Sequence, residues 1–216
     1  MNIMSMDIIL IFVLAVICAG LVKGTCPSTC SCVDDSSGSN VNCYSKYLGR
    51  IPTLPKDTYY LDLRHNHIAD INIQFCKEMP QLQHLYISYN LITEIPEITF
   101  ADCEQLYRIY LYNNKIRSLV SYTFINLTNL YELELSGNPL NCDCSIFPFW
   151  SWLIERASLG TTAKCSNGTL VTSLQSVVLD ICHPDNCQCF NGGKCVAMGY
   201  TLICNCIGQW TGTFCQ

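Results

Sequence analysis

The sequence predicts a mainly β solenoid, closed at both ends by disulfide-bonded caps and followed by a small disulfide-rich module. Three observations predict this architecture. Apolar residues and an asparagine recur every 24 residues in the middle of the chain, two groups of four cysteines flank this repeat, and six cysteines occupy the C-terminal tail. Only 13% of the 216 residues are charged, about half the share of roughly 25% found in globular domains, which argues against a cytosolic enzyme.

Residues 1–24 precede the first cysteine group and contain an apolar run, Ile8 to Ala19, that is shorter than a membrane span of about 20 residues. We interpret this segment as a signal peptide, with a retained signal anchor as the alternative. Its first residues lack the usual positive charge, so the sequence does not define the cleavage position. Sixteen cysteines follow it, an even number that is typical of the disulfide framework of a secreted, extracellular protein. No second hydrophobic stretch follows, so no membrane span is expected. The net charge of −5 without a basic stripe argues against nucleic-acid binding.

Four segments define the repeat: LDLRHNHI, LYISYNLI, IYLYNNKI and LELSGNPL. Their alternating apolar pair predicts a short strand with one buried face. The asparagine that follows can pair backbone donors and acceptors in a tight turn. The segments resemble leucine-rich repeats, which implies a parallel sheet along the concave face of a horseshoe. We assign residues 58–137 to this array. It comprises three full repeats, 58–81, 82–105 and 106–129, and a fourth that begins at Leu130 and merges into the next region.

Cysteine clusters on both sides of the repeats resemble the caps of this family. Short arrays of repeats need such caps, because a terminal repeat cannot bury its own apolar face. We place the N-terminal cap at residues 25–57 and the C-terminal cap at 138–182, where the resemblance implies that Trp152 and Leu153 lie on a helix over the end of the core. The implied disulfides are Cys26 with Cys32, Cys30 with Cys43, Cys142 with Cys165, and Cys144 with Cys182.

Two cysteines lie inside the repeats. Cys76 aligns with Phe100 and Phe124 of the following repeats, and Cys103 aligns with other apolar residues, so both are expected in the core on the convex side. Two buried thiols and one additional disulfide are both compatible with this pattern.

The tail, residues 183–216, resembles an EGF-like domain in its six cysteines, its NGGKC segment and its WTG turn. Gln188, which stands alone between the first two cysteines, and Gln209 depart from the usual pattern. Calcium is not expected, because Ala197 stands where calcium-binding members carry Asn or Asp. The resemblance implies three disulfides: Cys187 with Cys195, Cys189 with Cys204, and Cys206 with Cys215. We expect a spacer or a stabilising appendage.

Catalytic patterns are missing from the sequence. It has no nucleophile elbow, no phosphate-binding glycine loop and no pair of histidines with metal spacing. Pairs of the form Cys-x-Cys could bind zinc, but their spacing to the next cysteines is that of the caps. We therefore predict no enzyme, no cofactor and no metal site.

Binding is expected on the outward positions of the strands, which we call the concave face. Five of the 12 tyrosines fall on these positions, and tyrosine is typical of interface hot spots. An ordinary strand preference for aromatic residues is the alternative. Positive residues precede negative ones along the face, which predicts a partner of mixed charge, a protein rather than a polysaccharide. The candidate contact residues are Tyr60, Asp62, Arg64, His65, His84, Tyr86, Tyr89, Arg108, Tyr110, Tyr112, Glu132 and Glu134.

Two sequons, Asn126-Leu-Thr128 and Asn167-Gly-Thr169, predict N-glycosylation of Asn126 on the convex side and of Asn167 in the C-terminal cap. Glycans at these positions would leave the concave face open.

The order of modules resembles Slit-type guidance proteins and, apart from a membrane span, vasorin-like proteins. We therefore expect a secreted extracellular protein-binding module whose partner is a receptor, a ligand or a matrix component. One alternative is a structural component of an extracellular or mineralised matrix. Another is an EGF-type signalling ligand, which is disfavoured because the tail lacks the Arg and Leu that such ligands carry around the last cysteine.

Overall fold

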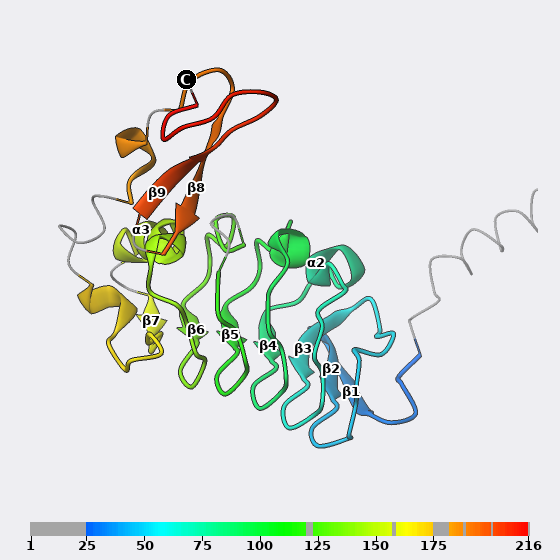
Figure 1. Cartoon of the computed structure of the whole chain (residues 1–216). Coiled ribbons are helices and arrows are strands. Elements are labelled where there is room, and N and C mark those ends of the chain that lie inside the picture. The colour runs from blue at the N-terminus through cyan, green and yellow to red at the C-terminus, as the bar shows by residue number, and fades with distance from the viewer. Residues whose placement is uncertain are drawn as a thin grey trace, which may run out of the picture.

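The computed structural model describes residues 25–119, 123–156, 159–174, 182–187, 189–199 and 201–215, so the expected signal peptide lies outside the described residues. Its main feature is a seven-stranded sheet in which the strands follow one another in chain order (Figure 1). The first two strands pair antiparallel and all later neighbours pair parallel. The strands are β1 (Ser31–Asp35), β2 (Gly38–Asn42), β3 (Thr58–Asp62), β4 (His84–Tyr86), β5 (Arg108–Tyr110), β6 (Glu132–Glu134) and β7 (Gly160–Thr161).

Strands β3 to β6 are neighbouring turns of the predicted β solenoid, which is confirmed and has about four turns. Residues that are 24 apart in sequence lie directly opposite one another, as Leu61 does with Leu85 and Ile109 with Leu133. These side chains are fully buried. The period therefore builds the core as columns of aliphatic residues, one residue from each turn.

The repeat asparagines form a second buried column beside the leucines. Asn90 Nδ2 donates to the carbonyl oxygens of Leu63 at 3.0 Å and Ile87 at 3.1 Å, and its Oδ1 accepts from the backbone N–H of Ile68 at 3.0 Å. Each asparagine thus bonds its own turn and the preceding one, which satisfies backbone groups that the tight turn leaves unpaired. The equivalent residues are Asn66, Asn114 and Asn138.

Short helices cover the convex side: α2 (Phe75–Glu78) and the 3-10 helix η1 (Glu97–Phe100). Phe75, Phe100 and Phe124 stack in a column with centroid separations of 5.9 and 5.7 Å. The alignment of Cys76 with Phe100 is therefore wrong, because the ring that continues the column belongs to the preceding residue. α2 is an α-helical turn whereas η1 is a 3-10 turn, so the two segments do not match residue by residue.

Cys76 and Cys103 form a disulfide between the first and second repeats. Both residues are buried, with 4% and 1% of their surface exposed. The sequence left two buried thiols and one additional disulfide as alternatives. The structure has the disulfide.

The two cysteine-rich regions that were expected to be caps flank the repeats at either end of the sheet. The structure has the four cap disulfides that the resemblance implies. In the C-terminal cap the 3-10 helix η2 (Cys144–Ile146) leads into α3 (Phe147–Ile154), where Trp152 and Leu153 are buried. The ring centroid of Trp152 lies 5.7 Å from that of Phe124, so α3 packs against the end of the phenylalanine column. A further 3-10 helix, η3 (Val171–Ser173), lies in the same cap.

The tail begins with the 3-10 helix η4 (Pro184–Asn186) and contains the antiparallel hairpin of β8 (Lys194–Met198) and β9 (Thr201–Asn205). Its disulfides are the three that the resemblance implies. The hairpin turn contacts the C-terminal cap, since Cys144 N–H donates to the carbonyl oxygen of Gly199 at 2.7 Å (Figure 1). Leu202 also packs against the main core. The tail is therefore docked on the cap.

Among the described residues, no helix has both the length and the apolar character needed to cross a membrane.

Candidate partner-binding face

The register of β3 to β6 fixes two rows of outward residues on the concave face. Most of these residues are half-buried, which leaves part of each side chain accessible. The first row contains Tyr60, His84, Arg108 and Glu132, and the second contains Asp62, Tyr86, Tyr110 and Glu134. The residues beyond the strand ends, Arg64, His65, Tyr89 and Tyr112, continue the face towards the turns.

Seven rings on this face form one continuous group, which we call the aromatic cluster. It spans the N-terminal cap and the first three repeats. The ring centroids follow one another at 5.0 Å (Tyr44 to His65), 4.2 Å (His65 to Tyr89), 5.2 Å (Tyr89 to Tyr112), 6.2 Å (Tyr112 to Tyr110), 4.8 Å (Tyr110 to Tyr86) and 5.0 Å (Tyr86 to Tyr60). These separations fall in the range of favourable ring pairs, so each ring is held by its neighbours.

Arg64 lies between the two arms of the cluster. Its guanidinium carbon is 5.7 Å from the ring of Tyr44 and 5.2 Å from that of Tyr86, both cation–π distances. Two of its nitrogens bond the carboxylate of Asp62, Nη2 at 2.6 Å and Nε at 3.0 Å. These bonds raise the pKa of Arg64. Arg64 therefore links Tyr44 and Tyr86, which belong to different arms of the cluster.

Asp62 was expected to contact a partner, but only 3% of its surface is exposed. Its carboxylate is used inside the protein, where it orients Arg64. Little of Asp62 is therefore left accessible to a partner, and its contact with one stays a prediction.

The expected separation of charge along the face is also modified by the fold. Arg108 Nε donates to Glu132 Oε2 at 3.1 Å across the strands, so a cation of the third repeat is neutralised by the next turn. Glu134, in turn, accepts a hydrogen bond from the hydroxyl of Thr162. Most of the charges on the face are therefore already paired within the chain.

Two rings of the cluster occupy strained backbone. His65 and Tyr89 have φ angles of 57° and 55°, and the equivalent position two turns further along is Gly137, with φ of 69°. This left-handed conformation favours glycine and costs a side-chain-bearing residue free energy. Asn113, with φ of 53°, has the same conformation one turn after Tyr89, so the turn of each repeat requires it whichever side chain stands there.

Sequence reasoning missed some aromatic residues of this region. Tyr44 lies in the N-terminal cap, outside the 24-residue period, so no repeat alignment could place it beside His65. Tyr107 and Tyr131 are 24 apart and stack at 5.1 Å with almost parallel planes at the entrance to their strands. Their spacing could have identified them, but they stand one residue before the outward positions.

Burial affects the acid–base behaviour of the face. It lowers the pKa of His84, with a further contribution from the charge of Arg108, so the imidazole is neutral at neutral pH. Burial, together with a hydrogen bond to Glu132, raises the pKa of Tyr110 from 10.0 to about 12.

Tyr110 should therefore ionise at a higher pH in the folded protein than in the unfolded chain. The folded state keeps a proton that the unfolded state loses near pH 10, so the stability that this tyrosine contributes is complete below pH 10 and is lost as the pH rises towards 12. Tyrosinate absorbance measured on the wild type and on Tyr110→Phe should differ by one group that ionises near pH 12. The same pair in denaturant is the control, and a difference titrating near pH 10 in both states would contradict the prediction.

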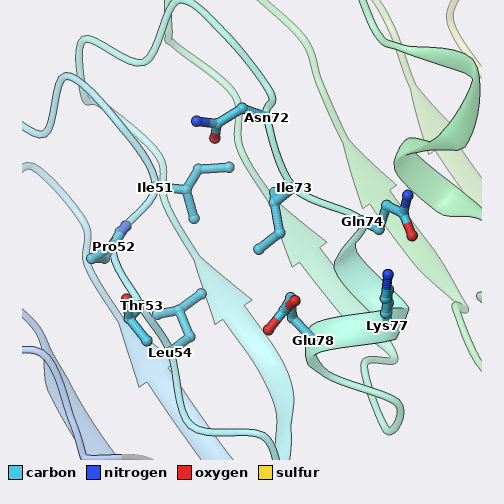
Figure 2. Close-up of a pocket in the computed structure, with 9 residues that line it drawn as sticks. All are labelled: Ile51, Pro52, Thr53, Leu54, Asn72, Ile73, Gln74, Lys77 and Glu78. Atoms are coloured by element: carbon cyan, nitrogen blue, oxygen red, sulfur yellow. The ribbon is translucent and has the colours of Figure 1, made fainter.

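A separate pocket of about 380 Å³ lies where the N-terminal cap meets the first repeat (Figure 2). Ile51 and Ile73 line it from opposite segments, and Lys77 and Glu78 reach it from α2. Among the described lining residues, Glu78 is the one carboxylate, with no histidine or cysteine beside it. The titratable groups among its described lining residues are thus Lys77 and Glu78, which are neighbours in sequence on α2.

The four sulfurs of Cys187, Cys189, Cys195 and Cys204 lie within 4.8 Å of one another in the tail. A zinc site would need these cysteines as thiolates. In the structure they form two disulfides instead.

The comparisons with known proteins agree with this geometry in the middle of the chain. A family model described as "Leucine rich repeat" matches residues 57–116 and 80–140. Similar proteins include "Leucine-rich repeat-containing protein 3" of Danio rerio, 42% identical over 83 residues, which are 38% of this chain and 31% of that protein. "Epiphycan" of Gallus gallus is 35% identical over 71 residues, 33% of this chain and 21% of that protein.

"Leucine-rich repeats and immunoglobulin-like domains protein 1" of Homo sapiens is 29% identical over 80 residues, 37% of this chain and 7% of that protein. The chain thus spans less than a third of the length of each of these curated relatives. The period, the register of the strands and the family model agree, and residues 57–140 therefore consist of leucine-rich repeats.

Proposed function

We propose that this chain is a secreted, extracellular protein-binding module that holds its partner on the concave face. The observation that carries the proposal is the aromatic cluster. Proteins with leucine-rich repeats generally mediate protein–protein interaction, and the relatives with such repeats are typically binding proteins without catalytic activity. The cluster supports the concave face as the site of this role.

The physical properties of the cluster suit a binding site. Tyrosine offers a large contact area and a hydroxyl, and it loses little conformational freedom when a partner binds. Here the stacking of the rings and the paired Arg64 restrict the side chains before binding, which lowers the entropic cost of association. We therefore propose Tyr86, Tyr110 and Tyr112 as the central anchors.

The paired charges refine the chemistry of the partner. Because Arg64 and Arg108 are already bonded to Asp62 and Glu132, the partner need not supply complementary charges at these positions. We propose a protein surface that contributes apolar and aromatic side chains to the cluster, in place of the mixed-charge surface expected from the sequence. Binding of this kind depends only weakly on salt, unlike binding driven by exposed charges.

Replacement of Tyr86, Tyr110 and Tyr112 by alanine tests the proposal. Loss of three hot-spot rings should weaken partner binding by at least about 100-fold, since each hot spot contributes about 2 kcal/mol or more. The measurement is capture of extracellular proteins by the immobilised full chain, followed by affinity measurement on the partner identified.

Tyr47→Ala is the matched control, because Tyr47 is 82% exposed and lies outside the aromatic cluster. The control should bind like the wild type at both low and high salt. Circular dichroism of the triple variant should show that the solenoid is retained. Unchanged affinity in a folded triple variant would exclude the concave face as the binding site.

The remaining parts of the chain would then serve secretion and stability. We propose that residues 1–24 are a signal peptide, that residues 25–57 and 138–182 are caps, and that 183–216 form an EGF-like domain. The disulfide order of the tail and its hairpin support this assignment. The contact of its turn with Cys144 supports a stabilising role over one as a separate signalling ligand.

A further inference from the structure

A second surface feature lies on the convex side, at the sequon of Asn126. The side chains of Asn126 and Thr128 are exposed on a turn that follows the buried Phe124. A pocket of about 260 Å³ opens beside this turn, and Asn126 itself is one of its lining residues. The residue that would carry a glycan is therefore at the edge of the pocket.

The pocket is bordered by apolar side chains that the fold leaves uncovered. Ile98 of η1 is 55% exposed and Ile125 of the next turn is 44% exposed. The carboxylate-bearing Glu97 lines the same pocket. Both aliphatic side chains line this one pocket, so a group that occupies it would remove part of their apolar surface from water.

We infer that the first N-acetylglucosamine of a glycan on Asn126 occupies this pocket and covers Ile98 and Ile125. The inference rests on the proposed secretory route, because the glycan is added there. A pyranose ring has an apolar face of C–H groups and a rim of hydroxyl groups, which suits a site with aliphatic walls and one carboxylate. The volume lies just below the range of about 300–1,000 Å³ of ordinary ligand pockets, which suits a single sugar.

Covalent attachment makes this contact effective. A free sugar would bind such a shallow site weakly, but a sugar linked to Asn126 is held next to the pocket at a high effective concentration. The other sequon provides an internal comparison. Asn167 Oδ1 accepts from the backbone N–H of Thr169 at 3.0 Å, and Asn167 does not line the pocket of Ile98.

The test uses the full chain secreted from cells that make oligomannose glycans. Thr169→Ala leaves the sequon of Asn126 alone, and an endoglycosidase then trims its glycan to one N-acetylglucosamine. The double variant Thr128→Ala/Thr169→Ala carries no glycan and keeps Asn126 uncharged. The single-sugar form should melt about 2–4 °C above the double variant, a shift ordinary for one modest contact in a protein of this size.

Two further variants isolate the pocket. Ile98→Ser should abolish the difference between the single-sugar and bare forms, because the wall that the sugar covers is removed. The Thr128→Ala variant, which retains only the sequon of Asn167, should melt at the same temperature with and without its sugar. Equal melting of the single-sugar and bare forms at Asn126 would overturn the inference.

Glycosidase treatment distinguishes a failure of the inference about Asn126 from a failure of the proposed function. If Asn167 is modified and Asn126 is not, the inference fails while the secretory route stands. If neither asparagine is modified in protein recovered from the medium, the inference fails while the secretory route stands. Retention of the whole chain inside the cells would be the failure of the secretory route.

Discussion

Replacing Asn90 by alanine is expected to lower the free energy of unfolding by about 2–4 kcal/mol. The change removes two donors to backbone carbonyls and the Oδ1 acceptor of Ile68 N–H, and each hydrogen bond is worth about 1 kcal/mol net. Leu63 and Ile87 keep other asparagine partners. Ile68 N–H loses its acceptor in a buried position, which adds a desolvation cost.

The measurement is guanidinium unfolding under non-reducing conditions, followed by circular dichroism. Asn72→Ala is the matched control, because Asn72 is exposed and stands outside the asparagine column. A loss below 1 kcal/mol for Asn90→Ala, or equal losses for both variants, would show that the column does not hold neighbouring turns together.

Removing the disulfide between Cys76 and Cys103 should lower the free energy of unfolding about as much as Asn90→Ala does. The double variant Cys76→Ala/Cys103→Ala opens a loop with a sequence separation of 27 residues, for which chain-entropy arguments give a loss of about 3–4 kcal/mol. The same unfolding experiment should show the transition of the solenoid at lower guanidinium concentration. Cys206→Ala/Cys215→Ala is the control, since this disulfide lies in the tail and the solenoid transition should stay in place.

Thiol labelling provides an independent check of the crosslink. Wild-type protein that is unfolded without a reducing agent should not react at Cys76 or Cys103. Labelling of both residues would contradict the prediction, because it would show two buried thiols in place of the bond.

The spacing of the repeats and their resemblance to leucine-rich repeats together predicted the solenoid and its register. Residues 24 apart, such as Leu61 and Leu85, are direct neighbours in the parallel sheet, so the sequence period and the spatial period are the same. The convex side was harder to align, because the replacement of a 3-10 turn by an α-helical turn shifts Phe75 relative to Phe100. A pattern of apolar residues does not distinguish these two kinds of turn.

The composition of the concave face was predictable but its internal contacts were only partly so. The pair of Arg108 and Glu132 follows from the register, since the two residues lie directly opposite one another. The pair of Asp62 and Arg64 depends on how deeply Asp62 is buried, which the spacing does not reveal. Tyr44 joins the aromatic cluster from the cap, whose geometry the repeat period does not govern.

The bond between Cys76 and Cys103 also restricts how this array can change length during evolution. Loss or duplication of whole 24-residue units keeps the columns in register, so arrays of this type can grow and shrink. Deletion of residues 82–105 would remove Cys103 and leave Cys76 with an unpaired thiol. Deletion of residues 106–129 would leave the bond intact. The first two repeats are therefore covalently linked as a unit, and the third carries no disulfide of this kind to its neighbours.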